Sequence, residues 1–264
     1  MKGIEFVNWL FRDDENIYFD SGCTVYATDD VKKIIITLDV DSGSLIYASK
    51  HGFDTIITHH AVGKHYYQAS KEIFRRADLL YKKGVLSPEQ YDPKTDAQGI
   101  CESMWSANKI SVCSLAKQLN INLVSCHSIA DELIAKRITA ICQNNTSKNT
   151  VISELFTLLN AEYFSSTYGI EPHIYGECEE TFNMAYCDIS YSVPPSDYIL
   201  EKVIDNGYDL LIVTAISHNA LLYAKKKKVT VICINHLQAD ICAMMQLSEM
   251  ISASFPSLTL SLVW

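Results

Sequence analysis

Short apolar runs rich in β-branched residues recur along the chain, and each has the length of one buried strand. They cover residues 34–40, 55–58, 121–126, 210–214 and 229–234. Amphipathic segments with helical spacing lie between and after them, at 44–50, 71–83, 104–119, 198–205, 220–226 and 242–252. Buried strands that alternate with helices are typical of an α/β fold in which helices cover both faces of each sheet.

The two halves of the chain repeat one order of motifs. In each half a Gly-aromatic-Asp turn opens a strand that leads toward a histidine, in segments 52–59 and 207–218. Later in each half a second strand runs into a His-x-x-x-Asp step, His127 with Asp131 and His236 with Asp240. We interpret this pattern as a duplication, which predicts two similar α/β domains at 1–142 and 150–264, joined by the polar run 143–149.

The first half also contains an extra stretch, at about 65–108, that has no counterpart in the second. It combines a predicted helix with a polar loop. A connection of this length in a compact unit is more often a lid or an interface element than an idle loop.

Composition and charge limit the classes of function. Lys and Arg number 22 against 31 Asp and Glu, which gives a net charge of −9 and argues against a protein that binds duplex nucleic acid. The nine cysteines are scattered and form no C-x-x-C pair, which favours free thiols in a reducing cytoplasm. No apolar run approaches the roughly 18 residues of a membrane span. We therefore expect a cytoplasmic protein that does not enter a membrane.

Histidines and aspartates gather where predicted strands end. His59 and His60 follow one strand, and adjacent residues on a regular strand would point to opposite faces unless the chain turns, as the sequence 61–63 permits. Taken alone, this pair is more often structural than functional. The two His-x-x-x-Asp steps place each imidazole and carboxylate on one face of a helix.

Each of these steps, taken alone, favours a capping Asp and a hydrogen-bonded His. Their repetition, together with the His-His pair at a third strand end, favours a metal site instead. Mixed nitrogen and oxygen ligands suit zinc, iron, manganese or nickel, and differ from the thiolates of structural zinc. Ligand-type side chains from three strand ends are too many for one four-coordinate ion with an open position. We predict two divalent metal ions per chain, held by the set His59, His60, Asp131, His236 and Asp240.

Other chemistries find little support in the sequence. A phosphate-binding G-x-x-x-x-G-K-[ST] loop, a G-x-S-x-G elbow and a G-x-G-x-x-G fingerprint are all missing. Cys126 precedes His127 directly and invites comparison with a nucleophile, but a buried thiol at a strand end is the simpler interpretation.

Four motifs together resemble those of the NIF-three-like family, whose members are often catalogued as GTP cyclohydrolase 1 type 2 homologues. They are LDV at 38–40, GFDTIITHH at 52–60, H-S-x-x-D at 127–131 and N-H-x-x-x-D at 235–240. The resemblance implies two similar α/β domains that face each other across a cleft containing two metal ions. It also implies a toroidal hexamer built from dimers.

Carried over residue by residue, the resemblance implies that the metal ligands are His59, His60, Asp131, His236 and Asp240. It also implies that His127 lies beside them. The chain departs from the family at several positions: alanine replaces the proline at Ala61, serine replaces a threonine at Ser128, and Asp240 replaces a glutamate. The family's T-G-D block is Thr-Ala-Ile at 214–216, so an acidic group is missing there.

These observations predict a hydrolase that depends on two metal ions and acts on a small molecule. His127 or His218 would handle protons. The family resemblance implies a purine nucleotide as the substrate, and a phosphoester is the other candidate. The alternative is a non-catalytic metal-binding or regulatory protein of the same fold. By the same resemblance we expect a homo-oligomer.

Overall fold

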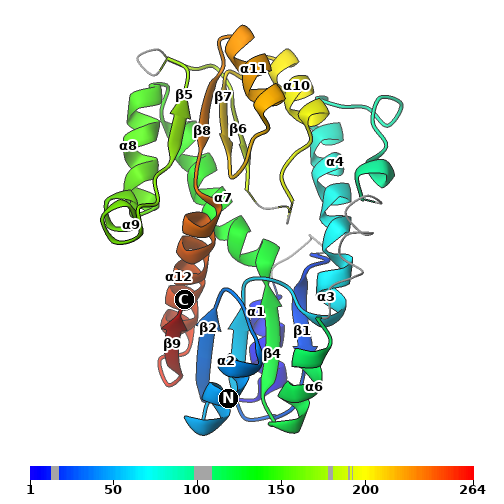
Figure 1. Cartoon of the computed structure of the whole chain (residues 1–264), viewed down its shortest axis with the longest axis vertical. Coiled ribbons are helices and arrows are strands. Elements are labelled where there is room, and N and C mark those ends of the chain that lie inside the picture. The colour runs from blue at the N-terminus through cyan, green and yellow to red at the C-terminus, as the bar shows by residue number, and fades with distance from the viewer. Residues whose placement is uncertain (13–17, 98–108, 178–180, 190, 192) are drawn as a thin grey trace. The chain divides into compact units, whose positions relative to one another are not determined.

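The computed structural model describes residues 1–12, 18–97, 109–177, 181–189, 191 and 193–264. It is a mixed α/β protein with two sheets flanked by helices (Figure 1). The chain divides into two compact units. The first comprises Met1–Ile73, Ala97–Ala130 and Ala243–Trp264, and the second comprises Phe74–Asp96 and Asp131–Cys242. In the described part of the chain, no helix combines the length and the apolarity that a membrane crossing requires.

The first unit is built on a five-stranded sheet in the order β1-β4-β3-β2-β9. Strand β1 runs antiparallel to β4, and the remaining neighbours are parallel. The strands are β1 (Ser21–Val25), β2 (Lys33–Thr37), β3 (Thr55–Thr58), β4 (Asn122–Cys126) and β9 (Thr259–Val263). The helical elements wholly in this unit are α1 (Gly3–Leu10), α2 (Ser42–Lys50), α3 (Gly63–Gln68), η1 (Ala69–Lys71) and α6 (Ser111–Gln118).

Helices cover both faces of this sheet. Figure 1 shows α2 and α6 on one face and α1 on the other. Ile35, Ile56 and Leu123 pack in one buried cluster with side chains of α2 and α6. Because alternate residues of a strand point to opposite faces, the intervening Ile36 and Ile57, also fully buried, face the other side. Burial on two faces explains why β2 and β3 have continuous apolar sequences rather than alternating ones.

The second unit contains a four-stranded sheet in the order β5-β8-β7-β6, with β5 antiparallel to β8 and the other neighbours parallel. Its strands are β5 (His173–Tyr175), β6 (Ala185–Asp188), β7 (Leu210–Val213) and β8 (Thr230–Cys233). Helices α8 (Lys148–Leu158), α9 (Ala161–Tyr168), α10 (Asp197–Asp205) and α11 (His218–Lys226) accompany it. Helices α4 (Glu72–Lys82), α7 (His127–Asn144) and α12 (His236–Ser254) contain residues of both units.

The two sheets share one topology. Strands β1-β4-β3-β2 of the first correspond in order and direction to β5-β8-β7-β6 of the second, and β9 is an addition to the first. The repeat of motifs along the chain therefore has a counterpart in the order of the strands.

The units differ in extent from the two continuous ranges, 1–142 and 150–264, that the sequence predicts. The C-terminal strand β9 pairs with β2 and belongs to the first unit, whereas 74–96, part of the predicted insertion, belongs to the second. The predicted linker 143–149 is mostly the end of α7 and the start of α8, where the Ser147 hydroxyl accepts a hydrogen bond from the Thr150 amide. Residues 98–108 of the insertion, including the start of the predicted helix 104–119, lie outside the described residues.

A buried ion pair fixes the end of β6 in the second unit. Arg76 of α4 and Asp188 are 1% and 2% exposed, and Nη2 of Arg76 lies 2.9 Å from Oδ1 of Asp188. The guanidinium also donates to the carbonyl oxygens of Val193 and Pro194 and lies over the ring of Tyr191, with 4.8 Å between the guanidinium carbon and the ring centroid. Asp188 therefore has a structural partner.

Replacing Arg76 by alanine should destabilise the protein strongly, because Asp188 would be left as a buried and uncompensated charge. We expect a loss of about 3–5 kcal/mol in the free energy of unfolding, measured by urea titration. Lys227→Ala is the control, because Lys227 forms a 2.7 Å ion pair with Asp205 at the surface and solvent already screens both groups. Equal losses in the two variants would contradict the structural role of Arg76.

Candidate metal centre

Two parallel strands of the first sheet bring three histidines to one edge. Strands β3 and β4 are neighbours, so their carboxyl ends meet at the same edge. His59 and His60 follow β3 directly, and His127 follows β4 as the first residue of α7. The site thus lies at the strand ends, where open α/β sheets commonly bind ligands.

The chain bends directly after β3, as the sequence predicts if both histidines are to share one site. The amides of His59 and His60 donate to the carbonyl oxygens of Thr37 and Leu38, both at 2.9 Å, and the two rings lie 5.3 Å apart between centroids. The turn depends on Gly63, whose φ is +57° and where an added Cβ would lie 2.6 Å from Cγ2 of Thr24.

The three imidazole rings form one cluster. The ring of His127 lies 4.5 Å from that of His59 and 5.9 Å from that of His60, measured between centroids. Each of the three residues offers a ring nitrogen, and these nitrogens all lie within 4.8 Å of one another. His59 is fully buried, His127 is 7% exposed and the side chain of His60 is 39% exposed. Three convergent nitrogen donors, one of them accessible to solvent, fit a transition-metal ion or zinc.

The carboxylates of Asp39 and Asp20 contact the rings of His60 and His127. Nδ1 of His60 is 3.0 Å from Oδ1 of Asp39, and this hydrogen bond lowers the pKa of the Asp39 carboxyl group. Nδ1 of His127 is 3.3 Å from Oδ2 of Asp20. A carboxylate that contacts one ring nitrogen of a histidine fixes the orientation of the ring. Such pairs commonly support histidines that bind a metal through the other ring nitrogen.

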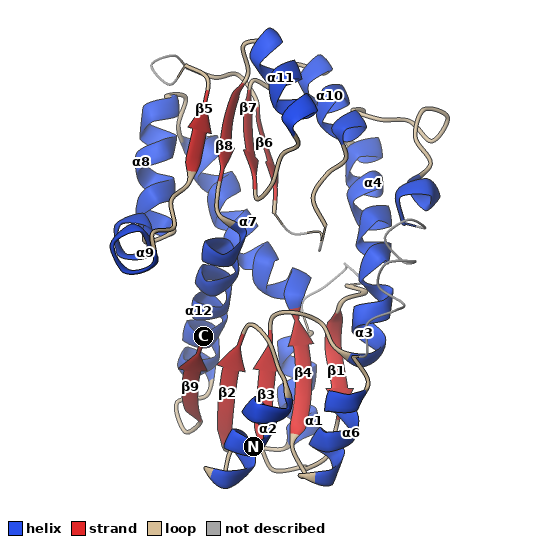
Figure 2. Cartoon of the chain, viewed as in Figure 1, coloured by secondary structure: helices blue, strands red, loops and turns tan. Residues whose placement is uncertain are grey.

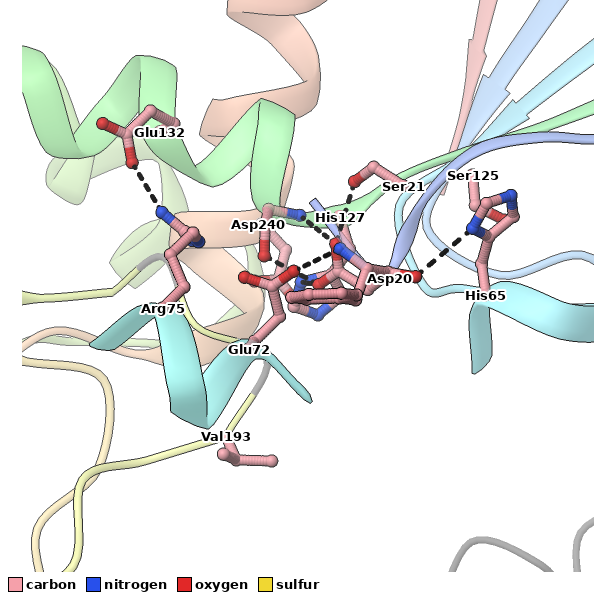
Figure 3. Close-up of polar contacts among 12 residues, drawn as sticks. Asp20, Ser21, His65, Glu72, Arg75, Ser125, His127, Glu132, Val193 and Asp240 are labelled. Atoms are coloured by element: carbon pink, nitrogen blue, oxygen red, sulfur yellow. Dashed lines mark hydrogen bonds and ion pairs between the residues drawn. The ribbon is translucent and has the colours of Figure 1, made fainter. Parts of the chain in front are cut away.

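Asp20 is a residue of this site that the sequence analysis missed. It is fully buried and accepts hydrogen bonds from the hydroxyl of Ser128 at 2.7 Å and from that of Ser21 at 2.9 Å. Figure 3 shows Asp20 with Ser21 and His127. It stands directly before β1, and the antiparallel register that places Ser21 opposite Cys126 brings it to the start of α7. The Phe-Asp pair at 19–20, directly before the strand, was its only signal, because the strand SGCTV is too polar to be recognised by its apolar pattern.

The other predicted residues occupy related positions. In the second unit, β7 and β8 are parallel neighbours, with His218 at the start of α11 and His236 at the start of α12, both exposed. Nε2 of His236 is 3.6 Å from Oδ1 of the buried Asp240, one helical turn later. Asp131 is buried one turn after His127 in α7. Of the predicted site residues, the structure thus brings together His59, His60 and His127 in the first unit, and His236 with Asp240 in the second.

Cys126 is a buried thiol, in agreement with the simpler of the two interpretations of its sequence. Its side chain is fully buried at the end of β4, and burial raises the pKa of the thiol far above its usual value. Because the thiolate is the reactive form, this cysteine is a poor nucleophile. The seven cysteines with described side chains are all free.

Comparisons with known proteins find similarity to solved structures but not to family models or curated sequences. No protein-family model matches the chain, and no curated protein sequence matches it. A NIF3 superfamily protein from Sphaerobacter thermophilus is 16% identical and has a TM-score of 0.78, over 100% of this chain and 99% of its own.

Two further solved structures are similar to this chain over nearly its whole length. The protein ybgI, described as of unknown function, is 16% identical with a TM-score of 0.58, over 100% of this chain and 98% of its own. A Bacillus cereus protein related to NIF3 is 10% identical with a TM-score of 0.51, over 98% and 95% of the two chains. The similarity spans essentially the whole chain, and the protein therefore has the fold of the NIF3 superfamily.

Proposed function

We propose that this chain binds two divalent metal ions and uses them to hydrolyse a small molecule. The observation that carries the proposal is the cluster of three imidazoles at adjacent strand ends, with carboxylates behind His60 and His127. Core histidines without a function need one hydrogen-bond partner each and have no reason to converge. Convergent nitrogen donors are what a zinc, iron, manganese or nickel ion requires.

The proposed ligands are His59 and His60 from the first unit, with Asp131, His236 and Asp240 as the remaining donors. Asp131 and Asp240 are 4% and 3% exposed, and each follows a histidine by one turn of its helix. Burial of a carboxylate is costly unless a cation or hydrogen bonds compensate it. The similar placement of the two His-x-x-x-Asp steps after β4 and β8 supports a shared role as metal ligands for their two aspartates.

When bound, a pair of such ions would supply an activated water and a Lewis acid for an attacked carbonyl, phosphoryl or ring carbon. The chain itself would hold and move the proton. Asp20 contacts Nδ1 of His127, which leaves Nε2 on the side away from that carboxylate as the atom that exchanges a proton. His218, exposed at the start of α11, is the second candidate for proton transfer.

The proposed substrate is a purine nucleotide, which the family resemblance of the motifs implies, or a phosphoester, which two metal ions can also attack. The exposed side of His60 gives a small molecule access to the cluster. A panel of GTP, other nucleotides and phosphoesters, assayed with each candidate metal, tests both the activity and the class.

A non-catalytic metal-binding or regulatory role is the second candidate. The segment after β7 supports it, because Thr214, Ala215 and Ile216 stand where the family motif has an acidic residue. Turnover that depends on added metal would exclude this role, whereas tight metal binding without turnover of any compound in the panel would favour it.

Metal stoichiometry tests the ligand set. We expect about two ions per chain after reconstitution with zinc, manganese or ferrous iron, because the proposed donors are too many for one four-coordinate ion. Asp240→Asn keeps the shape of the side chain but removes its charge, so it should lower the occupancy of the second ion and abolish hydrolysis. Asp240→Glu should retain both ions, and His218→Ala should leave metal content unchanged. If Asp240→Asn keeps two full ions by elemental analysis, Asp240 is no ligand.

Asp20 should matter for turnover although it is not a proposed ligand. Asp20→Asn keeps the volume but removes the charge that faces Nδ1 of His127, the proposed proton-transfer residue, so it should lower metal-dependent turnover by about 10–100-fold. Asp41→Asn is the control, because Asp41 caps α2 at the surface of the same unit and asparagine also serves as a cap. Assays with the most active compound of the panel measure both variants, with elemental analysis to verify metal content and thermal melts to verify folding. Equal turnover in the two variants would show that Asp20 only caps the start of α7.

A further inference from the structure

The two sheets have four edge strands, and three of them carry features that discourage pairing with another strand. Strand β1 has an irregular register between Cys23 and Val25 and packs against α3 and α6. Strand β5 has only three residues. Strand β6 has four residues, and the side chain of Arg76 binds Asp188 at its end. Short strands, bulges and covered ends are the usual means by which proteins protect sheet edges.

Strand β9 lacks all of these features. It pairs with β2 in an unbroken register of five residues, from Thr259 opposite Lys33 to Val263 opposite Thr37 (Figure 2). None of its residues is buried, and the sequence from 250 to 264 contains no charged residue. Leu262, Val263 and Trp264 are 42%, 41% and 47% exposed. An exposed, regular and apolar edge is a site where another strand pairs.

The register identifies which backbone groups face outward. The amide of Thr259 donates to the carbonyl oxygen of Lys32 at 2.9 Å, so residues 259, 261 and 263 bond to β2. Because alternate residues of a parallel strand bond to opposite neighbours, Leu260 and Leu262 direct their N–H and C=O groups to the outer side. No strand in the described part of the chain pairs with that side.

The start of β9 is held firmly in place. Phe255, in the turn between α12 and β9, packs edge-on against Trp9 and Phe6 of α1, with ring centroids at 4.8 and 6.0 Å. The strand is thus presented as a rigid edge, and pairing would require little further ordering of the backbone.

We propose that β9 pairs antiparallel with β9 of a second copy of this chain and forms a two-fold symmetric sheet contact. The outward backbone groups of Leu260 and Leu262 permit this pairing, and the register proposed places Leu262 opposite Leu262 of the partner subunit. A contact of this kind is self-complementary, because the same patch serves both copies. The absence of charge along 250–264 means that no like charges oppose each other across the axis. The exposed apolar side chain of Leu262 then packs beside its counterpart on the same face of the joined sheet. This contact does not depend on the proposed metal chemistry.

Charge reversal at the two-fold axis tests the proposal. In the purified full-length chain, light scattering should give a homo-oligomer with an even number of subunits. Leu262→Lys and Leu262→Asp should each at least halve the mass, because the two introduced charges oppose each other across the axis. Mixing these two variants should restore the assembly, since lysine then faces aspartate. Met250→Lys adds the same charge to an exposed apolar position of α12, and its mass should not change.

A covalent readout gives a second measurement. Opposed residues in such a hydrogen-bonded antiparallel pair have Cα atoms about 5.5 Å apart, within the range of a disulfide. Leu262→Cys should therefore form a dimer under mild oxidation on a non-reducing gel, and Met250→Cys should not. A monomer at all concentrations, an unchanged mass in both charged variants, or failure of Leu262→Cys to cross-link would each overturn the proposal.

Discussion

The parallel pairing of β3 with β4 is the constraint on which the candidate site depends. It places the ends of two strands that are distant in sequence at one edge of the sheet, with His59 and His60 after one and His127 after the other. The two strands pair in register from Thr55 opposite Asn122 to Thr58 opposite Ser125, so the residues that follow each strand meet at the same end of the sheet. The ring separations of 4.5–5.9 Å follow from this register together with the bend at Gly63.

Duplication explains much of the architecture, but corresponding positions in the two sheets carry residues with different roles. Both have the same order of four strands, with histidines after the two central parallel strands. In the first sheet Asp39, after β2, hydrogen-bonds to His60 of the cluster. In the second, Asp188 at the end of β6 is buried in an ion pair with Arg76. The aspartate at the end of the corresponding strand thus contacts a candidate metal ligand in the first unit, whereas it stabilises the fold in the second.

The elements that the sequence predicts well are those whose burial determines their composition. The central strands read as continuous apolar runs, and strand 55–58 has its predicted bounds. Strands β1, β5, β6 and β9 were missed because they lie at sheet edges, where polar and small residues are tolerated and the pattern is weak. Asp20 was missed together with β1. The pairing of β9 with β2 could not be predicted either, because a local sequence pattern does not reveal which strands become neighbours in a sheet.

The histidines were predicted because they follow recognisable strands and because the His-x-x-x-Asp step occurs twice. The supporting contacts behind them depend on tertiary packing, since Asp20 is separated from His127 by 107 positions of the printed sequence. Sequence patterns therefore indicated the candidate donors, while only the structure revealed the contacts that orient their rings.

X-ray absorption spectroscopy of the metal-loaded protein tests the central claim most directly. With zinc or iron bound, the account predicts backscattering from imidazole rings and a metal–metal separation of about 3.5–4 Å, as in two-metal sites. Both signals should weaken when His59 and His60 are replaced by glutamine. A spectrum without imidazole contributions, or one unchanged by these replacements, would contradict the assignment of this cluster as a metal centre.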